Sequence, residues 1–208
     1  MSKPFLFIVL IIVFSLKVNG QNTKFLNLSK DNQYLWAEIE FNDGSKEQGL
    51  IRDRNEYSRY SRIVFYDSMA KKSTYKPADI SAYRLKSGRF KSDSKSKKFY
   101  ELEGRGYKVS LYKFRYPPTT TSQYSLERSG SGVKVSDTSA YEDLGTFYFF
   151  YNKERKEFFR IPQEGDFHKE VAVFFKDCPE LSKRIIDKEF KENELSAIMD
   201  VYNFMCHL

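Results

Sequence analysis

Residues 33–52 read QYLWAEIEFNDGSKEQGLIR, and this stretch decides the fold. Apolar and polar side chains alternate over residues 33–41, which is typical of a strand with one buried face. The turn Asn42-Asp43-Gly44 follows. An Asp-Gly step between strand-like segments is a strong hairpin signal, because both central positions of such a turn favour positive φ. A return strand over residues 46–52 completes the hairpin, so the sequence predicts an antiparallel sheet.

The two faces of the first strand differ in character. The side predicted to face the core holds Leu35, Ala37, Ile39 and Phe41, and the other side holds Tyr34, Trp36, Glu38 and Glu40. Tyr34 and Trp36 are therefore candidates for an aromatic platform of the kind that binds sugars, since these rings combine an apolar body with a polar tip. The alternative is ordinary packing, because aromatic residues are favoured in sheets.

More short strands follow the hairpin, separated by turn signals. They are expected at residues 62–66, before Pro77, and at 81–85, 99–102, 107–114, 146–151 and 157–161. This spacing favours an antiparallel meandering sheet, open or partly closed into a barrel. Residues 117–144 are rich in Ser, Thr and Gly, and we expect a long mobile loop there, with a hairpin through Val133 and Val135 as an option.

The last part of the chain, residues 162–208, changes to helical patterns. Asp166 is placed to cap a helix over 167–175, and Pro179 suits the first position of a second helix. A third helix is expected over 192–205, where apolar residues recur at steps of three and four. We therefore predict an α+β protein, with a β-rich domain over 33–161 and the helical region packed on it.

Cys178 and Cys206 would meet if the last two helices run antiparallel. In an oxidising compartment this pair predicts a disulfide. The bond would close a loop of about 28 residues and contribute about 3 kcal/mol to stability. Two separate buried thiols are the alternative.

Residues 1–20 have the pattern of a cleavable secretory signal peptide. Lys3 precedes an apolar run over 5–16, and Val18-Asn19-Gly20 offers a cleavage site before Gln21. An uncleaved anchor is the alternative, although the run is short against the roughly 20 residues that cross a bilayer. We expect a flexible leader at 21–32, no transmembrane segment after cleavage, and a periplasmic, outer-surface or secreted location.

The formal net charge of +7 is mildly basic, and the charges are interspersed. Nucleic-acid binders usually concentrate Lys and Arg on one motif, so we expect no nucleic acid as a partner. One concentrated group stands out, formed by Lys86, Arg89, Lys91, Lys95, Lys97 and Lys98. In its serine-rich context it predicts an exposed, flexible hairpin loop. Such a loop either binds anionic polysaccharide or lipid headgroups, or is simply solvated.

No motif for a metal, a cofactor or a nucleophile occurs. His168 and His207 are the two histidines, and no HExxH, CxxC or GxSxG pattern is present. Paired carboxylates can hydrolyse glycosides, and the candidates are Glu38, Glu40, Asp79 and Glu101. Solvated strand faces that balance nearby lysines are the favoured explanation of these acids. We therefore assign no catalytic residue and no cofactor.

The order of these features resembles that of small exported proteins of Bacteroidota whose function is unknown. The shared features are the signal peptide, the hairpin with Asp-Gly in its turn, YKPADI at residues 75–80, DCPEL at residues 177–181, Tyr202-Asn203 and Cys206. The resemblance implies an envelope or secreted location and no known activity, so it transfers no functional residue.

The sequence thus predicts a non-enzymatic exported protein that binds a ligand or serves as a structural component of the envelope. Its partner would be an envelope protein or an anionic glycan. The alternative is an envelope or secreted hydrolase that acts on glycans. A cleft with two facing acids would favour the hydrolase, whereas a sheet face carrying Trp36, or a basic rim at residues 91–98, would favour binding.

Overall fold

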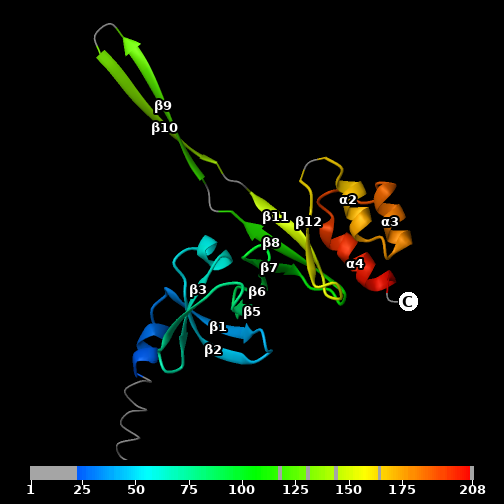
Figure 1. Cartoon of the computed structure of the whole chain (residues 1–208), viewed down its shortest axis with the longest axis horizontal. Helices are drawn as coiled ribbons and strands as arrows, with labels where there is room; N and C mark the ends of the chain where they lie inside the picture. The colour runs from blue at the N-terminus through cyan, green and yellow to red at the C-terminus, as the bar shows by residue number, and fades with distance from the viewer. Residues whose placement is uncertain (1–22, 117–118, 130–131, 143–144, 164, 207–208) are drawn as a thin grey trace, which may run out of the picture. The chain divides into compact units, whose positions relative to one another are not determined.

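A computed structural model describes residues 23–116, 119–129, 132–142, 145–163 and 165–206 of the chain. The predicted signal peptide lies outside these ranges. The chain divides into two compact units, one up to Arg105 and the other from Gly106 onward (Figure 1). Both units combine strands with helical segments, so the predicted α+β class is confirmed.

The first unit is an antiparallel sheet. Its strands are β1 (Tyr34–Phe41), β2 (Lys46–Arg52), β3 (Ile63–Asp67), β4 (Lys72–Tyr75), β5 (Ile80–Leu85), β6 (Gly88–Asp93) and β7 (Lys98–Gly104), with a short 3-10 helix, η1 (Glu56–Tyr60), between β2 and β3. They lie in the order β7-β6-β5-β1-β2-β3-β4, and β7 does not pair with β4. The predicted antiparallel sheet is therefore confirmed, and the partly closed barrel is not formed.

The opening hairpin has the predicted strands but a different turn. Gly44 adopts φ +84°, whereas Asp43 is not among the residues with positive φ in the described part of the chain. Instead, the Asp43 Oδ1 atom accepts hydrogen bonds from the backbone N–H and the hydroxyl of Ser45, at 2.9 and 2.6 Å. One glycine with positive φ is therefore enough to close this turn.

One face of the sheet carries the core of the first unit. Ala37 and Ile39 of β1 are buried as predicted. Next to them, the Tyr83 ring stacks on Phe90 at 4.5 Å and meets Phe99 edge-on at 5.1 Å. Because the core occupies this face, the alternate side chains of β1 point to the other face, where polar groups gather.

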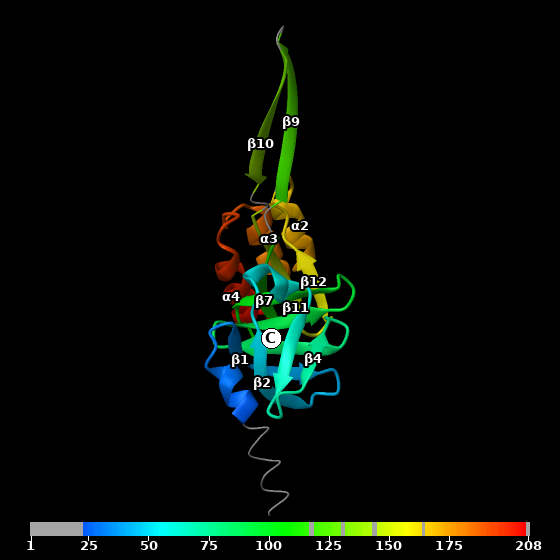
Figure 2. The ribbon, with the colours of Figure 1, turned by 90° about the vertical axis from the view of Figure 1, so that its left-hand side faces the viewer.

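Residues 23–29 form a helix rather than the predicted flexible leader (Figure 2). Phe25 is only 7% exposed, and its ring meets Trp36 edge-on at 5.5 Å. Leu28 packs against the same small cluster, which includes Leu50. Phe25 and Leu28 are three positions apart and share one helix face, so a segment that is mostly polar in composition is held by two apolar contacts.

The second unit pairs three strands with three helices. The strands β8 (Val109–Arg115), β11 (Thr146–Asn152) and β12 (Glu157–Arg160) lie in the order β12-β11-β8. The helices are α2 (Phe167–Phe174), α3 (Pro179–Ile186) and α4 (Leu195–Met205), and they lie beside these strands (Figure 1). Buried Val109 and Phe150 from the strands join Phe175, Ile198 and Tyr202 from the helical region in one core.

The predicted helix starts at Pro179 and Asp166 have different outcomes. Pro179 occupies the start of α3, as expected. Asp166 precedes α2, but its side chain makes no capping hydrogen bond, so its predicted role is wrong.

Two further strands pair with each other in a separate two-stranded sheet, seen as the long ribbon in Figure 2. They are β9 (Thr119–Ser129) and β10 (Gly132–Glu142). The predicted loop over 117–144 is wrong for these residues, and the hairpin option is confirmed. Threonine and serine made the segment look like a loop, yet threonine is β-branched and well suited to strands.

The predicted disulfide is present between Cys178 and Cys206, whose Cα atoms lie 5.8 Å apart. It joins the residue before α3 to the residue after α4. The expectation of an antiparallel helix pair therefore identified the correct partners, and the alternative of two separate thiols is wrong.

Candidate functional site

The face of the first sheet opposite its core carries a row of charged residues, and the strand register explains why. Glu38 of β1 lies opposite Gln48 of β2 on one side and Arg84 of β5 on the other. Arg84 in turn lies opposite Arg89 of β6. Directly opposed residues share a face of the sheet, so strands distant in sequence contribute to one surface.

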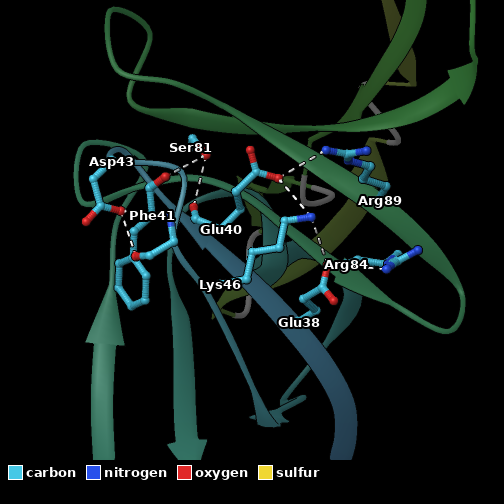
Figure 3. A network of polar contacts seen from close by, with 9 residues as sticks. Glu38, Glu40, Phe41, Asp43, Lys46, Ser81, Arg84 and Arg89 are labelled. Atoms are coloured by element: carbon cyan, nitrogen blue, oxygen red, sulfur yellow. Dashed lines mark hydrogen bonds and ion pairs between the residues drawn. The ribbon is translucent and has the colours of Figure 1, made fainter.

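These side chains alternate in charge and form a continuous network (Figure 3). Glu38 lies 3.2 Å from the Nη2 atom of Arg84 and 3.5 Å from the Nζ atom of Lys46. The same Nζ atom is 3.9 Å from Glu40, which pairs with Arg89 at 3.3 Å. Each exposed pair is worth about 0–1 kcal/mol, so the network positions side chains more than it stabilises the fold.

The electrostatic environment keeps Glu38 ionised. Burial opposes the charged carboxylate, but the positive charges of Arg84 and Lys46, with hydrogen bonds from Lys46 and Gln48, outweigh it and lower the pKa of Glu38. A general acid needs a raised pKa. The arrangement therefore makes Glu38 unsuited to donate a proton to a glycosidic oxygen.

Beside this network lies a hollow of about 410 Å³, open to solvent, which we call the Trp36 hollow. Its lining residues are Trp36, Ala37, Glu38, Gln48, Arg84, Leu85 and Lys86. Trp36 is 58% exposed. Ala37 pairs with Leu85, so Lys86, the next residue of the chain, lies beside Trp36 across the strands. The hollow thus joins an aromatic surface to a cluster of polar groups.

The lining groups are mostly hydrogen-bond donors. Arg84 and Lys86 are cationic, and Gln48 offers an amide. The acceptor capacity of Glu38 is largely taken by Arg84, Lys46 and Gln48. Within the described part of the chain, Lys86 makes no ion pair. The hollow is therefore suited to a ligand with an apolar face and acceptor groups at its edge.

The six basic residues that were predicted to share one exposed loop do not lie in a single loop. Arg89 and Lys91 lie in strand β6, Lys86 in the turn before it, Lys95 and Lys97 in the turn after it, and Lys98 at the start of β7. A strand of this length separates its two turns by about 20 Å. The predicted flexible loop is therefore wrong, and only Lys86 of the six lines the Trp36 hollow.

The predicted aromatic platform is also reduced to one ring. Tyr34 packs edge-on against Tyr66 at 5.4 Å, in the cluster with Phe25 and Leu50. Burial and a hydrogen bond with Tyr66 raise the pKa of Tyr34. Tyr34 does not line the hollow, and Trp36 does.

The four candidate carboxylates are not brought together. Glu38 and Glu40 share the polar face, whereas Glu101 lies opposite Phe90 and so faces the core side, where it accepts a hydrogen bond from the Tyr60 hydroxyl at 3.0 Å. Asp79 accepts a hydrogen bond at 2.7 Å from the backbone N–H of Lys76 in a turn. These positions give no pair of acids facing one another across a cleft in the described residues.

The described residues form neither a metal site nor a membrane-spanning helix. In the described ranges, no three residues among His, Cys, Asp and Glu are arranged to hold a metal ion. The Nε2 atom of His168 lies 2.9 Å from the carbonyl oxygen of Phe190 and links the helical region internally. No helix in these ranges has the length and apolar character needed to cross a membrane.

The fold and the hollow define a β-rich α+β protein with an open, donor-rich site on the polar face of its first sheet. Comparisons with family models, curated proteins and solved structures found no match to this chain. The resemblance to exported proteins of Bacteroidota therefore stays a prediction.

Sequence reasoning missed three residues of this face, namely Lys46, Gln48 and Arg84. The first two could have been found, because pairing the predicted hairpin about its turn places Gln48 opposite Glu38. Arg84 could not, because it depends on β5 pairing with β1, and no local signal specifies that pairing.

Proposed function

We propose that this protein is an exported binding domain of the cell envelope that holds a glycan in the Trp36 hollow. The observation that carries the proposal is Trp36 itself. A large aromatic ring that is 58% exposed lies beside Gln48, Arg84 and Lys86. Sugar rings have apolar faces and hydroxyl edges, and binding sites for small ligands combine an apolar surface with a few placed polar groups.

Two features support the exported location. The disulfide between Cys178 and Cys206 suits an oxidising compartment, where such bonds persist. The pattern of residues 1–20 is that of a signal peptide. The periplasm, the outer surface and secretion all remain within the proposal, as does the relationship to exported proteins of Bacteroidota.

The hydrolase alternative gains no support from the described carboxylates. Glu38 is held ionised by Arg84 and Lys46, and Glu40 is paired with Arg89. Binding without catalysis is the simpler use of this face, because both of these carboxylates are already engaged in ion pairs.

The proposal can be tested through the chain's own fluorescence, because Trp36 is the single tryptophan. Titration of the purified protein with an array of soluble oligosaccharides should change the tryptophan emission for at least one of them. Calorimetry should then show that Trp36→Ala lowers the affinity for that glycan about tenfold or more.

A matched control is Tyr107→Ala, which removes a ring that is 77% exposed in the other unit. This variant should bind as the unchanged protein does. A glycan that binds equally well to the Trp36→Ala variant, with its fold verified by circular dichroism, would show that the hollow is not the binding site.

A further inference from the structure

We propose that the glycan in the Trp36 hollow is acidic, with its carboxylate or sulfate group at Arg84 and Lys86 and its sugar ring on Trp36. This inference rests on the proposed function and specifies its ligand class. It follows from three properties of the hollow: its charge balance, the free donors of Arg84, and the position of Lys86.

The charge balance of the lining is positive. Arg84 and Lys86 contribute two positive charges and Glu38 contributes one negative charge, which leaves one positive charge in excess. The carboxylate of Glu38 is also neutralised from outside the hollow by Lys46. An anionic group in the hollow would therefore meet an uncompensated positive charge.

Arg84 retains donors for a ligand. Within the described residues, Glu38 engages only its Nη2 atom, at 3.2 Å, and the Arg84 side chain is 62% exposed. A guanidinium carries five N–H donors in a planar fork that matches a carboxylate or a sulfate. When a ligand takes this free edge, Glu38 still keeps Lys46 and Gln48 as partners.

Lys86 places a second cation beside the aromatic surface. It is exposed, it makes no ion pair with the described residues, and the register puts it next to Trp36. An acidic sugar has the matching shape, with a flat apolar ring face and a charged group at the edge of the ring. A neutral sugar would leave Lys86 without an anionic partner and the free edge of the Arg84 guanidinium without an acceptor of matching charge.

The experiment compares three oligomers of equal length by calorimetry: galacturonic acid, its methyl ester and galactose. The glucose series is measured in the same way, together with a sulfated galactose oligomer. We expect an acidic oligomer to bind about tenfold more tightly than its uncharged counterparts. The advantage should shrink as salt is added, because exposed charges are screened.

Single substitutions test which cations bind the acidic group of the ligand. Lys86→Gln and Arg84→Gln should each bring the affinity for the acidic oligomer close to that of the ester. The matched control is Lys95→Gln, which removes the same charge from the turn at the other end of β6 and should change nothing. Lys86 lies in a turn, so its replacement tests the inference even if Arg84→Gln disturbs the Glu38 network.

The outcomes separate this inference from the proposed function. If the uncharged oligomers bind as tightly as the acidic ones, and Trp36→Ala abolishes both, the ligand is a neutral glycan and the acidic specificity is refuted. An equal loss from Lys95→Gln and Lys86→Gln would refute the placement of the charge in the hollow. If no oligomer in the array binds at all, the proposed function fails as well.

Discussion

The side chain of Asn203 makes hydrogen bonds to backbone groups at the start of β8. Its Oδ1 atom accepts hydrogen bonds from the backbone N–H groups of Lys108 and Val109, at 2.7 and 3.1 Å. Its Nδ2 atom donates to the carbonyl oxygens of Val109 and Met199, at 2.8 and 2.7 Å. The amide thereby ties the end of α4 to the start of β8. Two of the four bonds use its oxygen as an acceptor, and the other two use its nitrogen as a donor.

The substitution Asn203→Asp should destabilise the protein by about 3 kcal/mol, because it replaces a donor with an acceptor facing two carbonyl oxygens. Urea unfolding at neutral pH measures the loss. Ser196→Ala, on the exposed side of the same helix, is the control and should cost about 0.5 kcal/mol or less. Equal midpoints for the two variants would mean that the amide bonds contribute nothing to the fold.

Gly106 lies against the Asn203 amide and the start of β8, where there is no room for a side chain. A Cβ atom at this position would overlap the carbonyl oxygen of Val109 and the amide of Asn203. Glycine is thus required here by the close approach of α4. No pattern in the sequence indicated this, because Gly106 and Asn203 lie far apart in the chain and each looks ordinary in its own segment.

At the scale of elements, the disulfide between Cys178 and Cys206 fixes the start of α3 to the end of α4. Reduction should lower the free energy of unfolding by about 3 kcal/mol if loop entropy dominates. Urea unfolding with and without a thiol reductant measures this change.

The control for that measurement is the double variant Cys178→Ala, Cys206→Ala. It should show the stability of the reduced protein and should not respond to the reductant. An unchanged midpoint on reduction of the natural protein would contradict the prediction.

Elements with a strong local pattern were predictable. The β1–β2 hairpin carries alternation and a glycine turn, and α3 begins with a proline. Strand β6 was missed because its single buried apolar residue, Phe90, stands among basic and serine residues. This segment is a strand because it pairs with β5 and β7. That pairing cannot be predicted from the composition of the segment.

The candidate site was predicted in part for the same reason. Trp36 follows from the alternation of β1, and Lys86 was included among the basic residues. Their proximity required the pairing of β1 with β5, a long-range contact. Sequence alone therefore supplied two of the groups, Trp36 and Lys86, whereas Gln48 and Arg84 and the arrangement of all four came from the fold.

For the whole molecule, the export hypothesis predicts a specific product. Expression of the full chain in a bacterial host should give an envelope-associated or secreted protein whose first residue is Gln21, as read by intact mass spectrometry. Leu10→Arg, which puts a charge into the apolar run, should retain residues 1–20 and leave Cys178 and Cys206 reduced. An envelope protein that still begins with the uncleaved segment would contradict this cleavage.

The hydrogen bond between Asn203 and Lys108 joins residues that are 95 positions apart, so it cannot form until long after Lys108 has been synthesised. Bacterial and eukaryotic ribosomes add about 5–20 residues per second, so about 5–19 s pass between translation of Lys108 and translation of Asn203. Throughout that interval the backbone N–H groups of Lys108 and Val109 lack the acceptor that Asn203 provides. The contact between α4 and the start of β8 can therefore form only near the end of synthesis.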